Sequence, residues 1–244
     1  MTVFFLRRCN CLGLALFLAL WAGLSSVTLA AGTSNSKNLA PGFSSLPATE
    51  KVVLLPIDVQ LYSLSMGGVE EPKADWTDAA RQHMASTLAQ DSVGLKLRSQ
   101  LLSETDVDDF SELVSLHAAV ASSISLHHWV AGSWALPSKA GQLDWDFGDA
   151  MKPLQDKFGA RYALFLWVRD SYASSERKAA MVAMAFLGVS LSGGVQIGYA
   201  SLVDLSSGKV VWFNRLARGH GDLRDAAAAT ATVKELLSGF PSGQ

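Results

Sequence analysis

The five histidines are the residues best able to hold a metal or move a proton, and their spacing suits neither task. His127 and His128 are adjacent, so they point to different faces of a helix and cannot bind one ion as an i, i+4 pair. His117 lies on the apolar face of a periodic segment, where a hydrogen-bonded core histidine is the simpler interpretation. We therefore predict no metal site and no bound cofactor.

Two acidic clusters and one glycine-rich stretch also have residue types that can support chemistry. The aspartates of Asp144–Asp149 precede a predicted helix, where carboxylates stabilise the positive end of the helix dipole. Those of Asp106–Asp109 have the spacing of part of a calcium loop, but the required glycine and closing glutamate are missing. The glycines between residues 188 and 198 are not followed by Lys-Ser or Lys-Thr, so they form no phosphate-binding loop. We predict no catalytic residues and a protein that is not an enzyme.

A basic cluster near the C-terminus is the main candidate for binding a ligand. Arg215, Arg218, His220 and Arg224 follow a predicted strand and precede a predicted helix, whose free backbone N–H groups favour anions. Two aspartates lie among them, so a solvated, salt-bridged surface is the competing interpretation.

Two further segments are candidate contact surfaces. Trp129 and Trp134 lie in a predicted loop, and tryptophan is common at the centre of protein interfaces. Ala179–Leu191 is strongly apolar and uncharged, but as a helix it would be about 20 Å long, short of the ~30 Å core of a bilayer. We predict a buried helix or an interface there, with an oligomer-lining or membrane-touching element as the alternative. Its large side chains are those of Met181, Met184, Phe186, Leu187 and Leu191.

The N-terminus has the three-part pattern of a secretory signal. Two arginines precede an apolar run, Cys11–Leu24, and small residues end at Ala30, so we predict a cleaved signal peptide over residues 1–30. An uncleaved anchor is the alternative. Cleavage removes both cysteines, Cys9 and Cys11, and changes the net charge from −2 to −4. Neither cysteine stands at the cleavage site, which argues against lipid anchoring. We expect a periplasmic protein without disulfides and, with no basic excess, without a nucleic-acid partner.

Hydrophobic periodicity predicts alternating strands and helices after residues 31–50, a Gly-, Ser- and Pro-rich stretch expected to be a flexible leader. Strands are expected over 51–64, 95–101, 162–168, 195–205 and 209–216. Helices are expected over 76–90, 105–128 and 222–238, and over 144–158 with a kink at Pro153 or as two short helices. The predicted fold class is α/β: a single domain over 51–240, with a mixed β-sheet of about five strands, helices packed on it, and a C-terminal β-hairpin followed by a helix.

Several pieces of this sequence resemble the periplasmic CsgG-like and TolB N-terminal-like superfamily. Val52–Pro56 is similar to its opening strand, and Gly159–Leu164 to the passage from a helix to the central strand. Leu202–Asp204, Ser207-Gly208 and Val210–Trp212 are similar to its closing hairpin. The resemblance is to an uncharacterised branch, because this chain lacks the lipidation cysteine and the amphipathic barrel hairpin of the ring-forming curli-secretion members.

The resemblance implies an envelope protein that assembles or scaffolds. We expect a non-enzymatic periplasmic protein that acts through protein–protein contacts in cell-envelope assembly or secretion, with envelope or secretion proteins or a second copy of itself as partners. Two alternatives stand beside it. One is a membrane-associated oligomer or channel component that uses Ala179–Leu191, and the other is a binder of a small anionic ligand near Arg215–Arg224.

Overall fold

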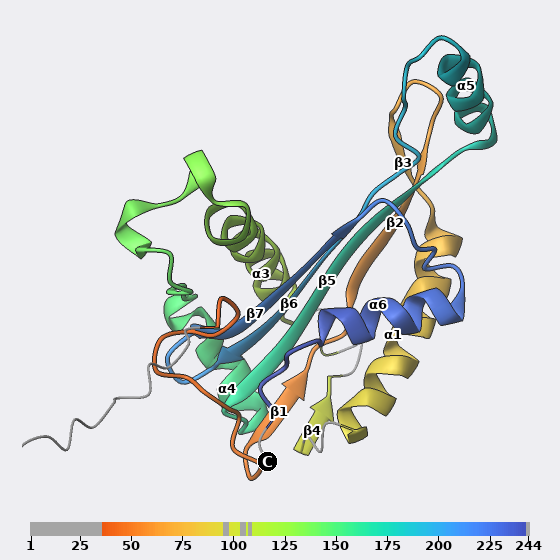
Figure 1. Ribbon diagram of the computed structural model, residues 1–244. Helices are drawn as coiled ribbons and strands as arrows, with labels where there is room; N and C mark the ends of the chain where they lie inside the picture. Colours follow the sequence, from red (N-terminus) through yellow and green to blue (C-terminus); the bar gives the residue numbers. More distant parts are fainter. Residues whose placement is uncertain (1–35, 95–97, 103–105, 107–108, 243–244) are drawn as a thin grey trace, which may run out of the picture. The chain divides into compact units, whose positions relative to one another are not determined.

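The computed structural model describes residues 36–94, 98–102, 106 and 109–242 (Figure 1). They form a mixed α/β arrangement in which helices cover both faces of one sheet. The predicted fold class is confirmed, although the sheet has seven strands where about five were expected. The predicted signal peptide lies outside the described residues.

Strand β5 (Tyr162–Ala173) is the centre of the sheet. Along one edge it pairs in parallel with two strands, β1 (Lys51–Leu54) and β2 (Asp58–Leu64). Along the other edge it pairs antiparallel with β6 (Gln196–Asp204). Pro56 lies between β1 and β2, and because proline has no N–H to donate, the predicted strand over 51–64 is divided there.

The remaining strands extend the sheet outward. β4 (Arg98–Leu101) lies parallel to β1, and β3 (Glu70–Pro72) lies antiparallel to β2. β7 (Lys209–Arg218) completes the predicted hairpin with β6, and its register shifts between Leu202 and Val203. The sequence analysis missed β3 because its residues are polar or proline and all are exposed.

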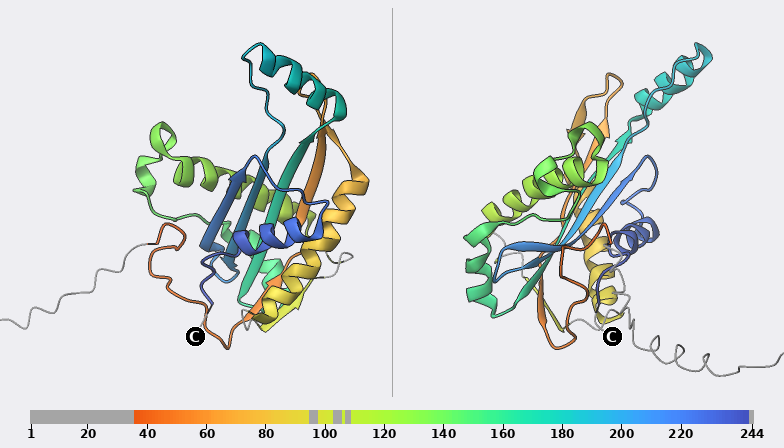
Figure 2. Two further views of the ribbon diagram at one scale, coloured as in Figure 1. Left: turned by 45° about the vertical axis from the view of Figure 1, so that its right-hand side comes forward. Right: turned by 60° about the vertical axis from the view of Figure 1, so that its left-hand side comes forward.

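Each face of the sheet has its own helical layer, which Figure 2 shows from two sides. α1 (Ala74–Gly94) and α6 (Ala226–Leu236) pack on one face. α3 (Ser111–Ile124) and α4 (Lys152–Phe158) pack on the other. The apolar run Val52–Leu55 supplies alternate side chains to the two layers, which is why it shows no polar alternation in the sequence.

Two predicted helices end differently from expectation. The helix expected to reach His128 is α-helical only to Ile124 and continues as a π-helix over Ser125–Val130. The segment expected over 144–158, with a kink or as two short helices, begins at Gly148 and is a 3₁₀ turn, Gly148–Met151, followed by α4. Pro153 lies in the first turn of α4, where its missing N–H leaves no bond unmade.

The segment from Ser36 to Glu50 packs on the domain, which departs from the flexible leader expected over 31–50. Asn38–Ala40 pairs with the outer edge of β7 on either side of Trp212. Leu46 is only 2% exposed, and its backbone N–H donates to the Pro241 carbonyl at 2.6 Å. This segment therefore covers part of an edge strand and fills part of the core.

α5 (Ser175–Phe186) connects β5 to β6 and projects beyond the sheet beside the β2–β3 turn (Figures 1 and 2). The interpretation of Ala179–Leu191 as a buried helix is therefore wrong: Phe186 is 87% exposed and Leu187 is 75% exposed. Among the described residues, no helix combines the length and the hydropathy needed to cross a bilayer.

Candidate functional site

The basic residues predicted to form one cluster are divided by the sheet. Arg215 and Arg218 lie on opposite faces of β7, three residues apart on a strand. Arg215 Nε donates to Ser125 Oγ at 2.8 Å, on the side of α3. Arg218 Nη2 donates to Thr232 Oγ1 of α6 at 2.7 Å, on the other side. His220 is exposed in the loop that follows β7.

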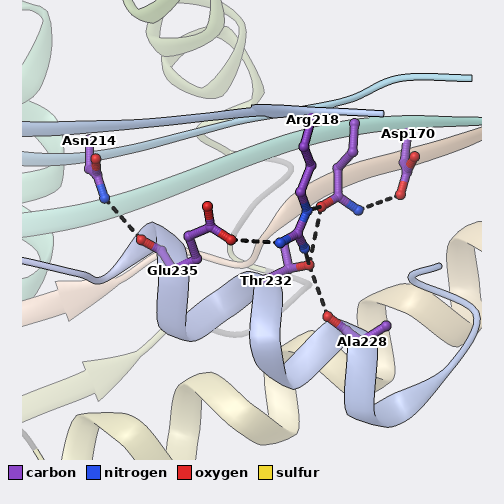
Figure 3. A network of polar contacts seen from close by, with 7 residues as sticks. Asp170, Asn214, Arg218, Ala228, Thr232 and Glu235 are labelled. Atoms are coloured by element: carbon purple, nitrogen blue, oxygen red, sulfur yellow. Dashed lines mark hydrogen bonds and ion pairs between the residues drawn. The ribbon is translucent and has the colours of Figure 1, made fainter. Parts of the chain in front are cut away.

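Arg218 belongs to a polar network that joins β7 to β6 and α6 (Figure 3). Its Nε donates to Gln196 Oε1 at 2.8 Å, and its Nη1 donates to Glu235 Oε2 at 2.6 Å. With Thr232 on Nη2, each guanidinium nitrogen has a partner within the protein. This arrangement fixes α6 to the sheet.

The network ends at a buried carboxylate that the sequence analysis did not select. Gln196 Nε2 and Tyr172 Oη both donate to Asp170 Oδ2, each at 2.5 Å. Asp170 is 3% exposed, and this burial raises its pKa to about 6, although the hydrogen bonds from Tyr172 and Gln196 oppose the shift. The strand was expected to end at Val168, so Asp170 fell outside it, whereas β5 continues to Ala173 and buries this aspartate.

Arg224 holds the loop 219–225 against β5 and α1. Its guanidinium lies over the rings of Trp76 and Tyr172, at 4.5 and 4.4 Å from their centroids. It also pairs with Asp222 at 2.5 Å, and the backbone N–H of Leu223 donates to Tyr172 Oη at 2.7 Å. Because these groups bind one another, Nε and Nη2 of Arg224 are already paired with Asp222, although the residue is exposed. An anionic ligand near Arg215–Arg224 stays a prediction.

The two predicted contact tryptophans differ in exposure. Trp129 is half-buried on the π-helix, where it packs near Phe213, and the Lys37 ammonium lies 5.1 Å from its ring centroid. Trp134 is 58% exposed on a 3₁₀ turn, and its carbonyl accepts a hydrogen bond from His127 Nδ1 at 2.6 Å. Of the pair, only Trp134 presents a large free surface.

His117 is a core histidine, as predicted. Its ring lies 4.7 Å from that of Phe165 in a stacked arrangement, and Nε2 is 2.9 Å from Ser201 Oγ. Complete burial lowers its pKa to about 3, because the charged form would lose its hydration. The ring is therefore neutral at physiological pH and serves the packing of α3 on the sheet.

The most exposed apolar surface lies on α5 and its surroundings, here called the tip: residues 181–191 together with the β2–β3 turn, 66–69. No charged residue occurs in the chain from Ala179 to Val195. A groove of about 370 Å³ runs between α5 and the returning chain, lined by Met181, Ala185 and residues 188–191. Met181, Met184 and Leu191 are half-buried. The exposed large side chains are those of Met66, Val69, Val182, Phe186, Leu187 and Val189.

Arg177 joins three segments at the base of the tip, here called the neck: the start of α5, the returning chain at residues 192–195 and the β2–β3 turn at residues 65–66. Its guanidinium is buried under the tip: Nε donates to the Ser192 carbonyl at 2.8 Å, and Nη1 donates to the carbonyls of Ser65 and Met66, each at 3.3 Å. The start of α5, the chain that returns from it and the β2–β3 turn are thus joined by one side chain. The tip is a built element with an uncharged surface.

A second hollow, of about 390 Å³, lies between β2 and the start of α1. Its charged groups are already paired, with Asp58 at 2.7 Å from Arg169 and Asp78 at 2.9 Å from Arg81. Across the described ranges, no three His, Cys, Asp or Glu side chains gather as metal ligands.

Comparison with known proteins found no matching family model and no matching curated sequence. The PelC dodecamer from Paraburkholderia phytofirmans is 16% identical with a TM-score of 0.40, over 83% of this chain and 96% of that chain. Lipoprotein GNA1162 from Neisseria meningitidis is 12% identical with a TM-score of 0.31, over 78% and 98%. The LpoB C-terminal domain from Salmonella enterica is 12% identical with a TM-score of 0.27, over 73% and 87%. No family match confirms the CsgG-like or TolB-like resemblance.

Proposed function

We propose that this chain is a non-enzymatic periplasmic protein that acts through contacts with an envelope or secretion protein during cell-envelope assembly or secretion. The observation that carries the proposal is the tip, where exposed apolar side chains gather on one projecting element. An uncharged apolar projection costs free energy in water, and such surfaces commonly mark sites of contact.

The chemistry of the tip indicates the kind of protein surface that fits it. Its groove is lined by methionine, alanine and valine side chains and has no charge, so it suits an apolar segment of a partner. Methionine adapts its shape to such a segment because its side chain is unbranched and flexible. The exposed ring of Phe186 beside the groove would act as an anchor.

Site-specific photocrosslinking in cells tests this proposal. A photoreactive residue at position 186 should give an adduct with an envelope protein identified by mass spectrometry, and Leu187→Ser should reduce that adduct several-fold. The matched control is the same residue at position 116, because Leu116 is also an exposed apolar residue on a helix. Equal protein adducts at both positions, together with a purified protein that is monomeric by light scattering, would reject the proposal.

Peripheral membrane contact is the second candidate, favoured by the absence of charge over Ala179–Val195 and the exposure of Phe186 and Leu187. A helix of this kind can lie in the interface of a bilayer without crossing it. Wild-type protein should co-sediment with phosphatidylcholine vesicles. The double change Phe186→Ser and Leu187→Ser should weaken binding by a factor of about ten or more, because each buried apolar side chain contributes roughly 1.5–3 kcal/mol. Leu116→Ser is the control, and protein that stays in the supernatant excludes this candidate.

A further inference from the structure

The pair Asp170 and Gln196 marks the base of the tip. It is the last regular pair between β5 and β6 before the chain enters the neck. Beyond it, the N–H of Val195 donates to Ser171 Oγ at 3.0 Å rather than to a backbone carbonyl. The side chains of Asp170 and Gln196 also hydrogen-bond to each other, so the pair joins the two strands twice.

The Gln196 amide is oriented by what lies on its two sides. An ionised carboxylate can only accept, so the NH₂ group of Gln196 must face Asp170. The amide oxygen then faces the other way, where it accepts from Arg218 Nε at 2.8 Å and from Thr232 Oγ1 at 3.2 Å. The orientation that satisfies Asp170 is therefore the one that binds Arg218.

Asp170 has no cation in direct hydrogen-bond contact within the described network, since Arg218 reaches it only through Gln196. Tyr172 of its own strand donates to it, and Asp222, from the loop 219–225, repels its charge. Arg224 of the same loop lies over the Tyr172 ring.

From α6, Thr232 and Glu235 bind Arg218 rather than Asp170, and α1 contributes Trp76 against Tyr172. With burial as the largest cause, the pKa of Asp170 is raised to about 6, within the mildly acidic range.

We infer that Asp170 and Gln196 form a proton-operated latch that decides whether the Arg218 side chain is hydrogen-bonded to the Gln196 side chain of β6. A proton from solvent converts the Asp170 carboxylate to a carboxyl group, whose O–H can donate to the Gln196 oxygen once the amide has turned over. The turned amide presents NH₂ to Arg218 Nε, and two donors cannot bond to each other. Arg218 then keeps Glu235 and Thr232 of α6 and its backbone pairing with Gln196, but loses the hydrogen bond from its Nε to the Gln196 amide. The latch does not depend on what the tip contacts.

Side-chain NMR of the purified protein across pH 4.5–7.5 tests the latch. The ¹⁵N signals of Gln196 NH₂ and Arg218 Nε–H should titrate together with a midpoint near pH 6. Solvent exchange of the Arg218 Nε–H should be at least several-fold faster on the acidic side. Unchanged Arg218 signals over this range in the wild-type protein would overturn the inference, whatever the variants do.

Two variants identify the titrating group. Asp170→Asn removes the titrating carboxyl group, so the Arg218 signal should no longer change with a midpoint near pH 6. Asp58→Asn is the matched control, since this carboxylate is paired with Arg169 on the same sheet and its removal should leave the Arg218 titration intact. A titration that persists in Asp170→Asn would assign the effect to another group and would overturn the inference.

Discussion

The pKa values of two buried side chains are shifted in opposite directions. Burial lowers the pKa of His117 to about 3 and raises the pKa of Asp170 to about 6, because in each case the charged form loses hydration. Both groups are nearly inaccessible, at 2% and 3% exposure. Both groups change the free energy of unfolding between about pH 4 and 6.5, so their contributions are separated by substituting one titratable group at a time.

His117 should make the fold sensitive to acid. The unfolded chain binds a proton below its ordinary pKa of 6.5 while the folded chain stays neutral down to about 3, so stability falls as the pH falls through this window. The double change His117→Phe and Ser201→Ala removes the histidine without leaving the hydroxyl unpaired. Relative to this variant, the wild type should lose up to about 2 kcal/mol between pH 7 and pH 5. Urea unfolding of both proteins at pH 7 and pH 5 measures their free energies of unfolding. A difference between wild type and variant that is the same at both pH values would contradict this prediction.

Asp170 should have the opposite effect. Its folded pKa lies above the ordinary value of 3.8, so the fold is favoured when the group is protonated and loses that contribution as the pH rises from about 4 to about 6. The free energy of unfolding of Asp170→Asn, relative to that of the wild type, should therefore be higher at pH 7.5 than at pH 4. The increase should be at most about 3 kcal/mol. Asp58→Asn, at a partly exposed ion pair, is the control. A difference that does not change with pH would contradict a pKa of Asp170 that is raised in the folded protein.

At the scale of elements, the neck decides how the tip is presented. Gly194 has a φ of +136°, and a Cβ at this position would lie 1.9 Å from the Ser171 carbonyl oxygen. Any other residue must move the backbone of β5 just beyond Asp170. Arg177 closes the neck from the other side through carbonyl oxygens. The tip therefore depends on contacts between segments that are distant in the sequence.

Gly194→Ala should disrupt the neck while leaving the sheet intact. The backbone strain and the clash should cost at least about 1–3 kcal/mol locally. Limited proteolysis should then cut the chain between residues 187 and 195 faster than in the wild type. Gly67→Ala is the control, because nothing lies within 4 Å of its Cβ position and its φ is not positive. Equal cleavage in the two variants would argue against the neck as the controlling contact.

At the scale of the whole domain, chain segments from both ends complete one core. Leu46 and Phe240 belong to the layer that contains α1 and α6. Trp212 of β7 belongs to the same layer, has no exposed surface and packs against the Phe240 ring. The segment before β1 is therefore structural from Ser36 onward, and stability is shared between the sheet and its N-terminal cover.

Leu46→Ala should destabilise the domain by about 2–5 kcal/mol, the usual cost of removing a large buried aliphatic side chain. Leu187→Ala removes the same atoms from an exposed position on the tip and should change the stability by less than about 0.5 kcal/mol. Thermal unfolding of both variants checks the comparison. A small loss of stability in Leu46→Ala would mean that the segment 36–50 contributes little to the stability of the domain.

Local patterns alone were sufficient for most of the secondary structure. Alternation and apolar runs placed β1, β2, the first part of β5 and the β6–β7 hairpin, and an apolar face placed α6, which begins after Asp225 rather than at the expected residue 222. They failed where a side chain's environment comes from distant segments. Ala179–Leu191 has the composition of a core helix, yet Val182, Phe186 and Leu187 are exposed.

The sequence by itself determined the α/β class, the order of the main elements and the core role of His117, because these follow from periodicity within each segment. Only the tertiary structure decided that Arg215 and Arg218 lie on opposite faces of β7 and that Asp170 is buried behind Gln196. It also decided that the apolar run of α5 is exposed. The physical reason is that burial and pairing depend on which segments meet, and strand order and register set those meetings across long separations in the chain.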